Sequence, residues 1–215
     1  NNTNSYTYNP FGLVLTQTDA LGHVTTYQYS GSQPSQITDA QGNVSSFTYD
    51  TNGNQLTQTV TKTFNGSPET ITTTNTYDKL NRLTKVTYPD GSETTTTYNA
   101  IGKVASSTDQ LGRSTSYSYD SMGQLLSTTF ADGTSTSSTY DAEGRRLTST
   151  DQLGRVTSFQ YDQLGRLTKT TAPDNSFTTT VYDSIGRVTS TTDQLGHTTS
   201  YEYDANCGCS GRRSK

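Results

Sequence analysis

Residues 161–182 read YDQLGRLTKTTAPDNSFTTTVY, and this stretch contains the pattern that decides the fold. It opens on Tyr161-Asp162 and closes on Tyr182, where the pattern begins again. Two turn signals, Asp162–Gly165 and Pro173–Asn175, separate short runs of Thr, Leu, Val and Phe. Asp, Asn, Gly and Pro favour tight turns, whereas Thr, Val and aromatic residues favour strands. The stretch therefore predicts a unit of turn, strand, turn and strand.

The Tyr-Asp pair recurs along the whole chain. From Tyr77 onward the step is constant, and the earlier tyrosines Tyr8, Tyr29 and Tyr49 keep nearly the same step. A regular step of about 21 residues defines an internal repeat. The step from Tyr49 to Tyr77 is longer, which predicts a lengthened hairpin at about residues 55–75.

We predict an all-β chain of tandem antiparallel β-hairpins forming a continuous coiled sheet. The predicted structural anchors are Tyr77, Asp78, Tyr98, Tyr119, Asp120, Tyr140, Asp141, Tyr161, Asp162, Tyr182, Asp183, Tyr203 and Asp204.

Each unit also contains a half-repeat, because Asp151–Thr157 closely copies Asp162–Thr168. In an Asp-x-x-Gly turn, the Asp carboxylate accepts backbone N–H groups and the Gly supplies the positive φ that follows a type I turn in a hairpin. The predicted turn glycines are Gly112, Gly123, Gly144, Gly154, Gly165, Gly186 and Gly196.

A longer period of two repeats, or about 42 residues, overlies the basic one. Two positions before the Tyr of a Tyr-Asp pair, Tyr117, Phe159 and Tyr201 alternate with Ser138 and Thr180. Side chains two apart in a strand share a face, so successive hairpins are expected to occupy two environments. We expect Leu, Val, Ile and Tyr ladders on one face and Thr and Ser on the other.

The composition predicts β-structure with a thin core. Only 27% of residues are hydrophobic, Trp is absent, and Thr makes up about a fifth of the chain beside 15 Tyr. The net charge of −4 is small and the basic residues are scattered, so no nucleic-acid partner is expected. No apolar run approaches the roughly 18 residues that span a membrane.

We expect residues 1–204 to form a single array of about ten hairpin units, and residues 205–215 to hold a Cys-Gly-Cys turn and the start of an unfinished repeat. Both ends fall inside a unit, and Asn1–Pro10 shows no export signal. These observations predict a segment of a longer array, or a subunit whose ends join other subunits.

No catalytic, cofactor-binding or metal-binding residue is predicted. Asp109, Asp151 and Asp193 are expected to cap turns, with a row of calcium sites as the alternative, although one Asp per turn falls short of the six or more oxygens that calcium takes. Cys207 and Cys209 do not make a zinc site with two distant histidines, and their thiols are expected to be free or paired outside this chain.

The histidines and arginines that follow the turn glycines are interpreted as part of the repeat. His23 and His197 stand where other units have Arg or Asn, so we read them as repeat variation. The arginines are expected to line the turn edge and to pair with Asp of adjacent turns; they are Arg113, Arg145, Arg155, Arg166 and Arg187.

The units Tyr161–Tyr182 and Tyr182–Tyr203 resemble the YD-repeat (RHS-repeat) family, and the resemblance extends over essentially the whole chain. It implies large secreted or surface proteins, mostly bacterial, with relatives among the teneurins. In that family the repeats form a spiralling sheet, often a hollow shell enclosing a toxin domain. This chain departs from the pattern in its dense Thr and Ser, its small number of units, and its lack of a toxin-like domain or a self-cleavage segment.

Three functions follow as hypotheses. The first is a non-catalytic structural scaffold of an extracellular or cell-surface bacterial protein, assembling into a filament or matrix. The alternatives are a wall segment of a toxin-encapsulating or toxin-delivering shell, and a surface adhesin or glycan-binding module. The expected partners are further copies or continuations of the array, with covalent glycans on Thr and Ser as an alternative to plain strand propensity on a solvated face.

Overall fold

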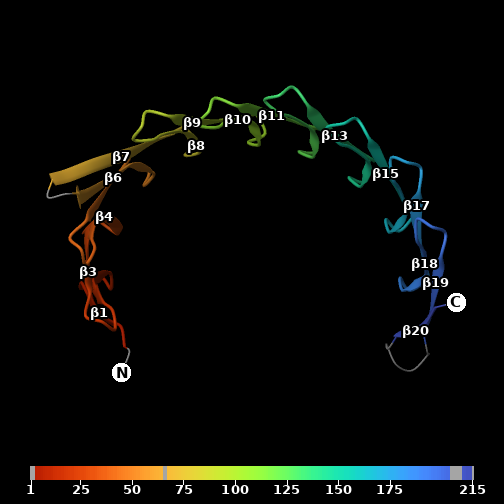
Figure 1. The fold of residues 1–215 in the computed structure, drawn as a ribbon, viewed down its shortest axis with the longest axis horizontal. Helices are drawn as coiled ribbons and strands as arrows, with labels where there is room; N and C mark the ends of the chain where they lie inside the picture. Colours follow the sequence, from red (N-terminus) through yellow and green to blue (C-terminus); the bar gives the residue numbers. More distant parts are fainter. Residues whose placement is uncertain (1–2, 65–66, 204–209, 215) are drawn as a thin grey trace. The chain divides into compact units, whose positions relative to one another are not determined.

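The computed structural model describes residues 3–64, 67–203 and 210–214, and this part of the chain contains strands and turns without any helix (Figure 1). The predicted all-β class of antiparallel hairpin repeats is therefore confirmed. The chain divides into two compact units, Asn1–Asn99 with Ser106–Ser114, and Ala100–Ala105 with Thr115–Lys215. Strand β10 (Val104–Thr108) is shared between them.

In the first unit each strand pairs antiparallel with the strands before and after it in the sequence. The longer step of the repeat, from Tyr49 to Tyr77, is accommodated by the long pair β6 and β7, of 10 and 11 residues. The strands are β1 (Ser5–Tyr8), β2 (Val14–Thr18), β3 (Val24–Ser30), β4 (Gln33–Thr38), β5 (Val44–Tyr49), β6 (Gln55–Phe64), β7 (Ser67–Tyr77), β8 (Leu83–Thr87) and β9 (Glu93–Tyr98).

The second unit repeats the same antiparallel pairing. Its strands are β11 (Ser114–Tyr119), β12 (Leu125–Thr129), β13 (Ser135–Tyr140), β14 (Arg146–Thr150), β15 (Val156–Tyr161), β16 (Leu167–Thr171), β17 (Phe177–Tyr182), β18 (Val188–Thr192), β19 (Thr198–Tyr203) and β20 (Ser210–Ser214). Because consecutive strands are antiparallel neighbours, successive turns lie at opposite ends of the strands, along the two opposite edges of the sheet. We call those after each Tyr strand the Tyr-Asp turns, and those on the opposite side the mid-repeat turns.

The Tyr-Asp turn at Asp162 shows how the sequence closes a hairpin. The N–H of Gly165 donates to the Asp162 carbonyl over 3.0 Å, and the N–H of Asp162 donates to the Arg166 carbonyl over 3.0 Å. Gly165 has φ +78°, a left-handed conformation that Gly adopts at little cost. The other predicted turn glycines also have positive φ, and they are Gly112, Gly123, Gly144, Gly154, Gly186 and Gly196.

The two faces of the sheet differ in chemistry. In β11 the alternation of exposure places Tyr117 and Tyr119 on one face, the aromatic face, and Ser116 and Ser118 on the other, the hydroxyl face. Across the hydroxyl face, cross-strand hydroxyls bond to each other, as in Ser118–Ser127 and Thr139–Thr148, both at 2.7 Å. Such pairs stabilise antiparallel strands without a second layer.

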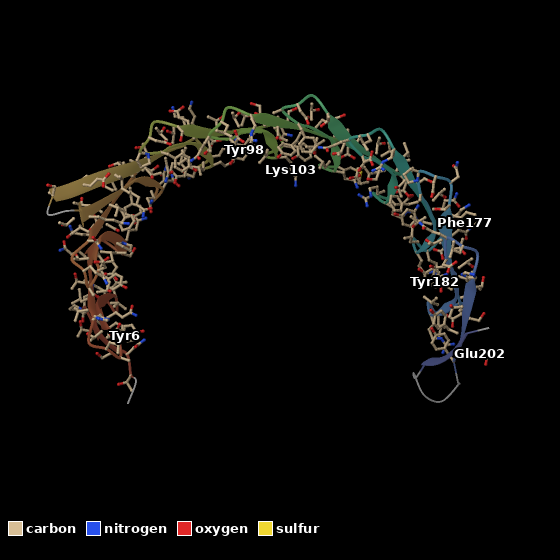
Figure 2. The ribbon with its side chains drawn as sticks, in the orientation of Figure 1. Tyr6, Tyr98, Lys103, Phe177, Tyr182 and Glu202 are labelled. Carbon is tan, nitrogen blue, oxygen red and sulfur yellow. The ribbon has the colours of Figure 1, made fainter. Side chains whose placement is uncertain are left out.

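Neither unit has a buried apolar core. Among the described residues no hydrophobic side chain is buried, and Thr128, which is 8% exposed and lies opposite Tyr117, is the one buried residue. Figure 2 shows side chains along both faces of the ribbon and no second layer of strands over them. Stability must therefore come from contacts between successive hairpins, as in other repeat proteins.

The turn glycines generate a test of this backbone. At Gly154 a Cβ would meet nothing within 4 Å, so Gly154→Ala is strained only by the φ of +76°. We expect Gly154→Ala to lower the free energy of unfolding by about 1–2 kcal/mol. Asn81 and Asn175 occupy the equivalent turn position with φ 61° and 67°, so Gly154→Asn should cost clearly less. Urea unfolding of both variants measures the difference, and equal losses would contradict the conformational explanation.

Candidate functional site

The most regular cluster of polar and aromatic side chains lies at the Tyr-Asp turns, where an Asp, an Arg and the Tyr of the next repeat meet. At Asp162 the carboxylate Oδ1 accepts the backbone N–H groups of Leu164 and Arg166, each over 2.9 Å. Its Oδ2 accepts the Nε–H of Arg166 over 2.6 Å. The carboxylate thus closes the turn and also fixes the arginine.

The arginine then reaches the next repeat. The Arg166 guanidinium lies 4.6 Å from the centroid of the Tyr182 ring, within the range of a cation–π contact. Its Nη1 donates to the Asp183 carbonyl over 3.0 Å. The Tyr182 hydroxyl donates back to the Leu167 carbonyl over 3.0 Å. We call this set of contacts the Asp–Arg–Tyr link.

Among the described residues, the same guanidinium-to-ring contact occurs at one repeat of the first unit and at two further repeats of the second. The guanidinium-to-ring distance is 4.2 Å for Arg82–Tyr98, 5.3 Å for Arg145–Tyr161 and 4.4 Å for Arg187–Tyr203. A Tyr hydroxyl also donates to the carbonyl 15 residues earlier in most repeats; these tyrosines are Tyr29, Tyr49, Tyr98, Tyr140, Tyr161, Tyr182 and Tyr203. Tyr77, which follows the long hairpin, bonds to the Gln55 carbonyl instead.

Several repeats lack the arginine of the link and have Leu13, Asn54, Lys103 or Gln124 in its place. The Gln124 side chain donates to the Gly144 carbonyl over 2.8 Å. The Gln124 Oε1 is buried without a hydrogen-bond partner. Asp120 therefore keeps its turn hydrogen bonds from Met122 and Gln124 but lacks the Asp–Arg ion pair found at Asp162.

The prediction that the arginines pair with Asp of adjacent turns is wrong. Each described Arg after a turn glycine pairs with the Asp four residues earlier in its own turn. The hydrogen-bonded turn brings these two side chains together, whereas the adjacent turn offers a carbonyl and an aromatic ring. His23 and His197 take the same place beside Asp19 and Asp193, at 2.8 and 3.0 Å.

The two kinds of turn differ in how well the arginine is covered. The Arg155 side chain of a mid-repeat turn is 61% exposed, whereas that of Arg166 in a Tyr-Asp turn is 25% exposed. The difference follows from the Tyr182 ring, which packs against Arg166. The Asp–Arg–Tyr link is therefore a structural contact between repeats, and the mid-repeat ion pair is a solvated one that contributes little.

The turn carboxylates are held in their charged form. The backbone N–H of Arg166, together with its guanidinium, lowers the pKa of Asp162 below its usual value. The guanidinium of Arg187 likewise lowers the pKa of Asp183. Hydrogen bonds and a nearby cation favour the ionised carboxylate, which explains the direction of both shifts.

The predicted anchors are distributed evenly along the sheet rather than gathered in one place. Each described Tyr anchor ends a strand and each described Asp anchor opens the following turn, while Asp204, Cys207 and Cys209 lie outside the described residues. Within residues 3–64, 67–203 and 210–214, no group of three or more His, Cys, Asp or Glu is placed to hold a metal ion. The same residues contain no helix that could cross a membrane.

A shallow hollow of about 330 Å³ lies on the aromatic face of the second unit. Thr136, Ser138 and Ser149 line it, together with Leu125 and Arg146. It occurs where the two-repeat alternation places Ser138 instead of an aromatic residue. Sequence reasoning predicted the alternation but not the hollow, because the depth depends on how neighbouring strands pair.

The repeat is similar to one that is known from other proteins. The RHS Repeat family model matches residues 8–33, 30–67, 77–106, 98–135, 123–153, 140–176 and 182–214. No curated protein matches the sequence.

Among solved structures, the fold is similar to that of TcdB2-TccC3-TEV, with a TM-score of 0.52 and 16% identity over 94% of this chain and 14% of that one. TcdB2-TccC3-Cdc42 gives a TM-score of 0.51 and 15% identity over the same shares. At these identities the likeness shows the fold alone, and the chain spans about a seventh of those proteins.

The missing link at Gln124 generates a second prediction. Gln124→Arg should add an ion pair to Asp120 and a cation–π contact to Tyr140, and it should remove the unpartnered Oε1. We expect the melting temperature to rise by a few degrees. Gln124→Met, which removes the buried amide without supplying a cation, is the matched control. An arginine variant no more stable than the methionine variant would show that the link does not stabilise the sheet.

The depressed carboxylate pKa values generate a third prediction. A group whose pKa is lower in the folded state stabilises it above the unfolded pKa of about 3.9, and this contribution is lost as the pH falls through the folded value. We therefore expect the melting temperature to decrease as the pH is lowered below about 4.

The control for that pH dependence is Asp162→Asn with Asp183→Asn. It should make the loss of melting temperature at acid pH smaller, because two of the carboxylates with lowered pKa values are removed. Asn9 already closes a turn in this chain, because its Oδ1 accepts the N–H groups of Phe11 and Leu13 over 2.9 Å. The double variant should therefore fold. If the melting temperature of the double variant fell with pH as much as that of the wild type, the pH dependence would belong to other groups.

Proposed function

Because the chain belongs to the RHS repeat family, we propose that it is a non-catalytic structural scaffold whose sheet forms part of the wall of a hollow shell. The observation that carries this proposal is the single-layered, two-faced sheet, which has no buried core among its described residues. The fold likeness to TcdB2-TccC3-TEV over 94% of the chain supports the same class of architecture.

A sheet of this kind suits a wall for a physical reason. Its aromatic face and its hydroxyl face differ along the strands, as β11 and β15 show, so the two sides of a wall would meet different surroundings. Where it occurs, the Asp–Arg–Tyr link joins one hairpin to the next and supports extension along the chain rather than a compact fold. We further propose a secreted or bacterial-surface location, in keeping with the family.

The filament or matrix is a second way for the same scaffold to assemble. Its support is the regular link between repeats, which would continue from one copy to another as readily as within one chain. A glycan-binding surface is a different candidate, favoured by the hollow of about 330 Å³ that hydroxyls and Arg146 line. Binding of an oligosaccharide by the wild-type protein, lost on Arg146→Leu, would favour it.

Covalent glycans on the hydroxyl face belong to the same proposal. Residues such as Thr139 and Ser118 are exposed on that face and would carry O-linked sugars that keep a thin sheet soluble. Mass spectrometry of the native protein is expected to show masses above that calculated for its unmodified sequence, in steps of one sugar. A single unmodified mass would overturn this part.

Electron microscopy of the protein purified from its native source tests the wall. Hollow particles with a wall one sheet thick are expected. Fibres of uniform width would replace the shell by the filament. Dispersed single chains at every concentration would overturn both forms of assembly.

A further inference from the structure

The hollow on the aromatic face of the second unit has an arginine at one end. Arg146 is exposed and lines this hollow of about 330 Å³ beside Leu125. Every other arginine whose side chain the structure describes pairs with a carboxylate. Arg146 has no such partner, and its guanidinium lies 5.0 Å from the centroid of the Phe159 ring. The hollow therefore carries a positive charge that is unpaired within the described part of the chain.

Strand pairing does not require an arginine at this position. Arg146 lies opposite Tyr140 in the register of β13 and β14. In the hairpins immediately before and after, the residues opposite the tyrosine are Leu125 and Leu167. Since leucine occupies this place in both neighbours, the arginine has a role other than holding the hairpin together.

The contact with the Phe159 ring does not require the arginine either. Two repeats further along, the equivalent residue is Val188, which precedes Tyr201 by the same separation as Arg146 precedes Phe159. An apolar residue therefore also serves beside an aromatic residue. What distinguishes the hairpin of β13 and β14 is an arginine together with the space that Ser138 leaves.

The hydroxyl groups of the hollow are free to bond to a ligand. Thr136, Ser138 and Ser149 line it, and their side chains form no hydrogen bond with the rest of the described residues. On the hydroxyl face, by contrast, such groups pair across the strands, as Thr139 does with Thr148 over 2.7 Å. A hydroxyl both donates and accepts hydrogen bonds. The lining therefore suits a polar ligand, because an apolar one would leave these groups unpaired.

The carboxylate at the hollow does not oppose an anionic ligand. Asp151 also lines the hollow, and its Oδ2 accepts the Nε–H of Arg155 over 2.7 Å. The backbone N–H of Arg155, together with its guanidinium, lowers the pKa of Asp151, so this carboxylate stays charged and paired. Arg146 begins β14 and Asp151 follows its last residue, which separates the two along the strand. An anion at Arg146 would therefore meet the unpaired cation rather than a free carboxylate.

The strands around the hollow leave no backbone edge for a peptide. Strands β12, β13, β14 and β15 each pair with a neighbour on both sides. An extended peptide that joins a sheet does so through an unpaired strand edge. The hollow instead offers its ligand side chains, which are hydroxyls, leucines and a guanidinium.

We propose that the hollow binds a hydroxylated carboxylate, with the carboxylate on Arg146 and the hydroxyl groups on Ser138 and Ser149. A guanidinium matches a carboxylate because its planar fork donates two parallel hydrogen bonds. The volume of about 330 Å³ lies at the lower end of the range of roughly 300–1,000 Å³ for small-molecule sites, which fits a sugar acid. A free sugar acid and an acidic sugar within a polysaccharide share this chemistry. The proposal rests on the glycan-binding candidate above, to which it adds the charge of the ligand, and it is independent of the wall.

Two variants taken from the chain's own repeats test the site. Arg146→Leu removes the charge and introduces the residue of the neighbouring hairpins, and Ser138→Tyr fills the hollow with the residue found at Tyr117. Both variants are therefore expected to fold. The matched control is Arg113→Leu, which removes an arginine that is 66% exposed at a mid-repeat turn and leaves the hollow unchanged. Circular dichroism and melting temperature establish that all three variants fold.

Isothermal titration calorimetry gives the readout. The acidic probes are galacturonate and tetragalacturonate, and the neutral probes are galactose and methyl-esterified tetragalacturonate. The wild-type protein and Arg113→Leu are expected to bind an acidic probe, and Arg146→Leu and Ser138→Tyr are expected to bind it at least about tenfold more weakly. Equal affinity for monomer and tetramer would support a free sugar acid as the ligand, whereas preference for the tetramer would support an acidic polysaccharide.

Three results would overturn the proposal. They are a wild-type protein that binds neither acidic probe, an Arg146→Leu variant that binds as well as the wild type, and binding of hexaglutamate in place of the sugar acids. Equal binding of acidic and neutral probes would also overturn it, but would retain the glycan-binding candidate. Hollow particles seen by electron microscopy without binding of any probe would retain the wall and remove the site.

Discussion

In most repeats the hydroxyl of the Tyr-Asp tyrosine holds its hairpin to the preceding one, and the rest of the structure depends on that bond. Tyr182 donates to the Leu167 carbonyl, and Tyr161 donates to the Arg146 carbonyl, both over 3.0 Å. One such hydrogen bond is worth about 1 kcal/mol. Since no hydrophobic side chain of the described residues is buried, contributions of this size, repeated along the sheet, take the place of a core. The tyrosine is therefore fixed in spacing as well as in type.

The turn carboxylate, the arginine and the tyrosine form a chain of dependence. Asn9 shows that a neutral side chain can close the turn, so the negative charge of Asp162 is not needed for closure. The charge instead orients Arg166, whose guanidinium then covers the Tyr182 ring. Where Gln124 replaces the arginine, the turn persists and the covering cation is lost. The three residue types are thus selected together, each for its effect on the next.

Sequence reasoning could predict the hairpins because their signals are local. Asp-x-x-Gly spacing and strand alternation determine the turns, the pairing order and the two faces, and the structure agrees at Gly165 and along β11. The partner of each arginine could not be predicted, because it depends on whether Arg166 folds back within its turn or extends to the next one. The structure shows that it does both, through its Nε to Asp162 and its Nη1 to the Asp183 carbonyl. The available signal was the sequence separation of Arg166 from Tyr182, which is the same as that of Arg82 from Tyr98.

Over the two-repeat period, the residue at the tip of the mid-repeat turn varies together with the residue on the aromatic face of the following strand. The mid-repeat turn that opens at Asp151 has Leu153 at its tip and leads into β15, which carries Phe159 on the aromatic face. The mid-repeat turn before β13 has Asp132 at its tip instead, and β13 carries Ser138 on the aromatic face. Apolar tip and aromatic ring therefore occur in the same half of the period, and polar tip and hollow occur in the other half. The kind of mid-repeat turn and the chemistry of the aromatic face therefore vary together along the chain. A block of two hairpins is consequently the smallest unit that repeats the surface chemistry of this scaffold, although a single hairpin is the unit that repeats its backbone.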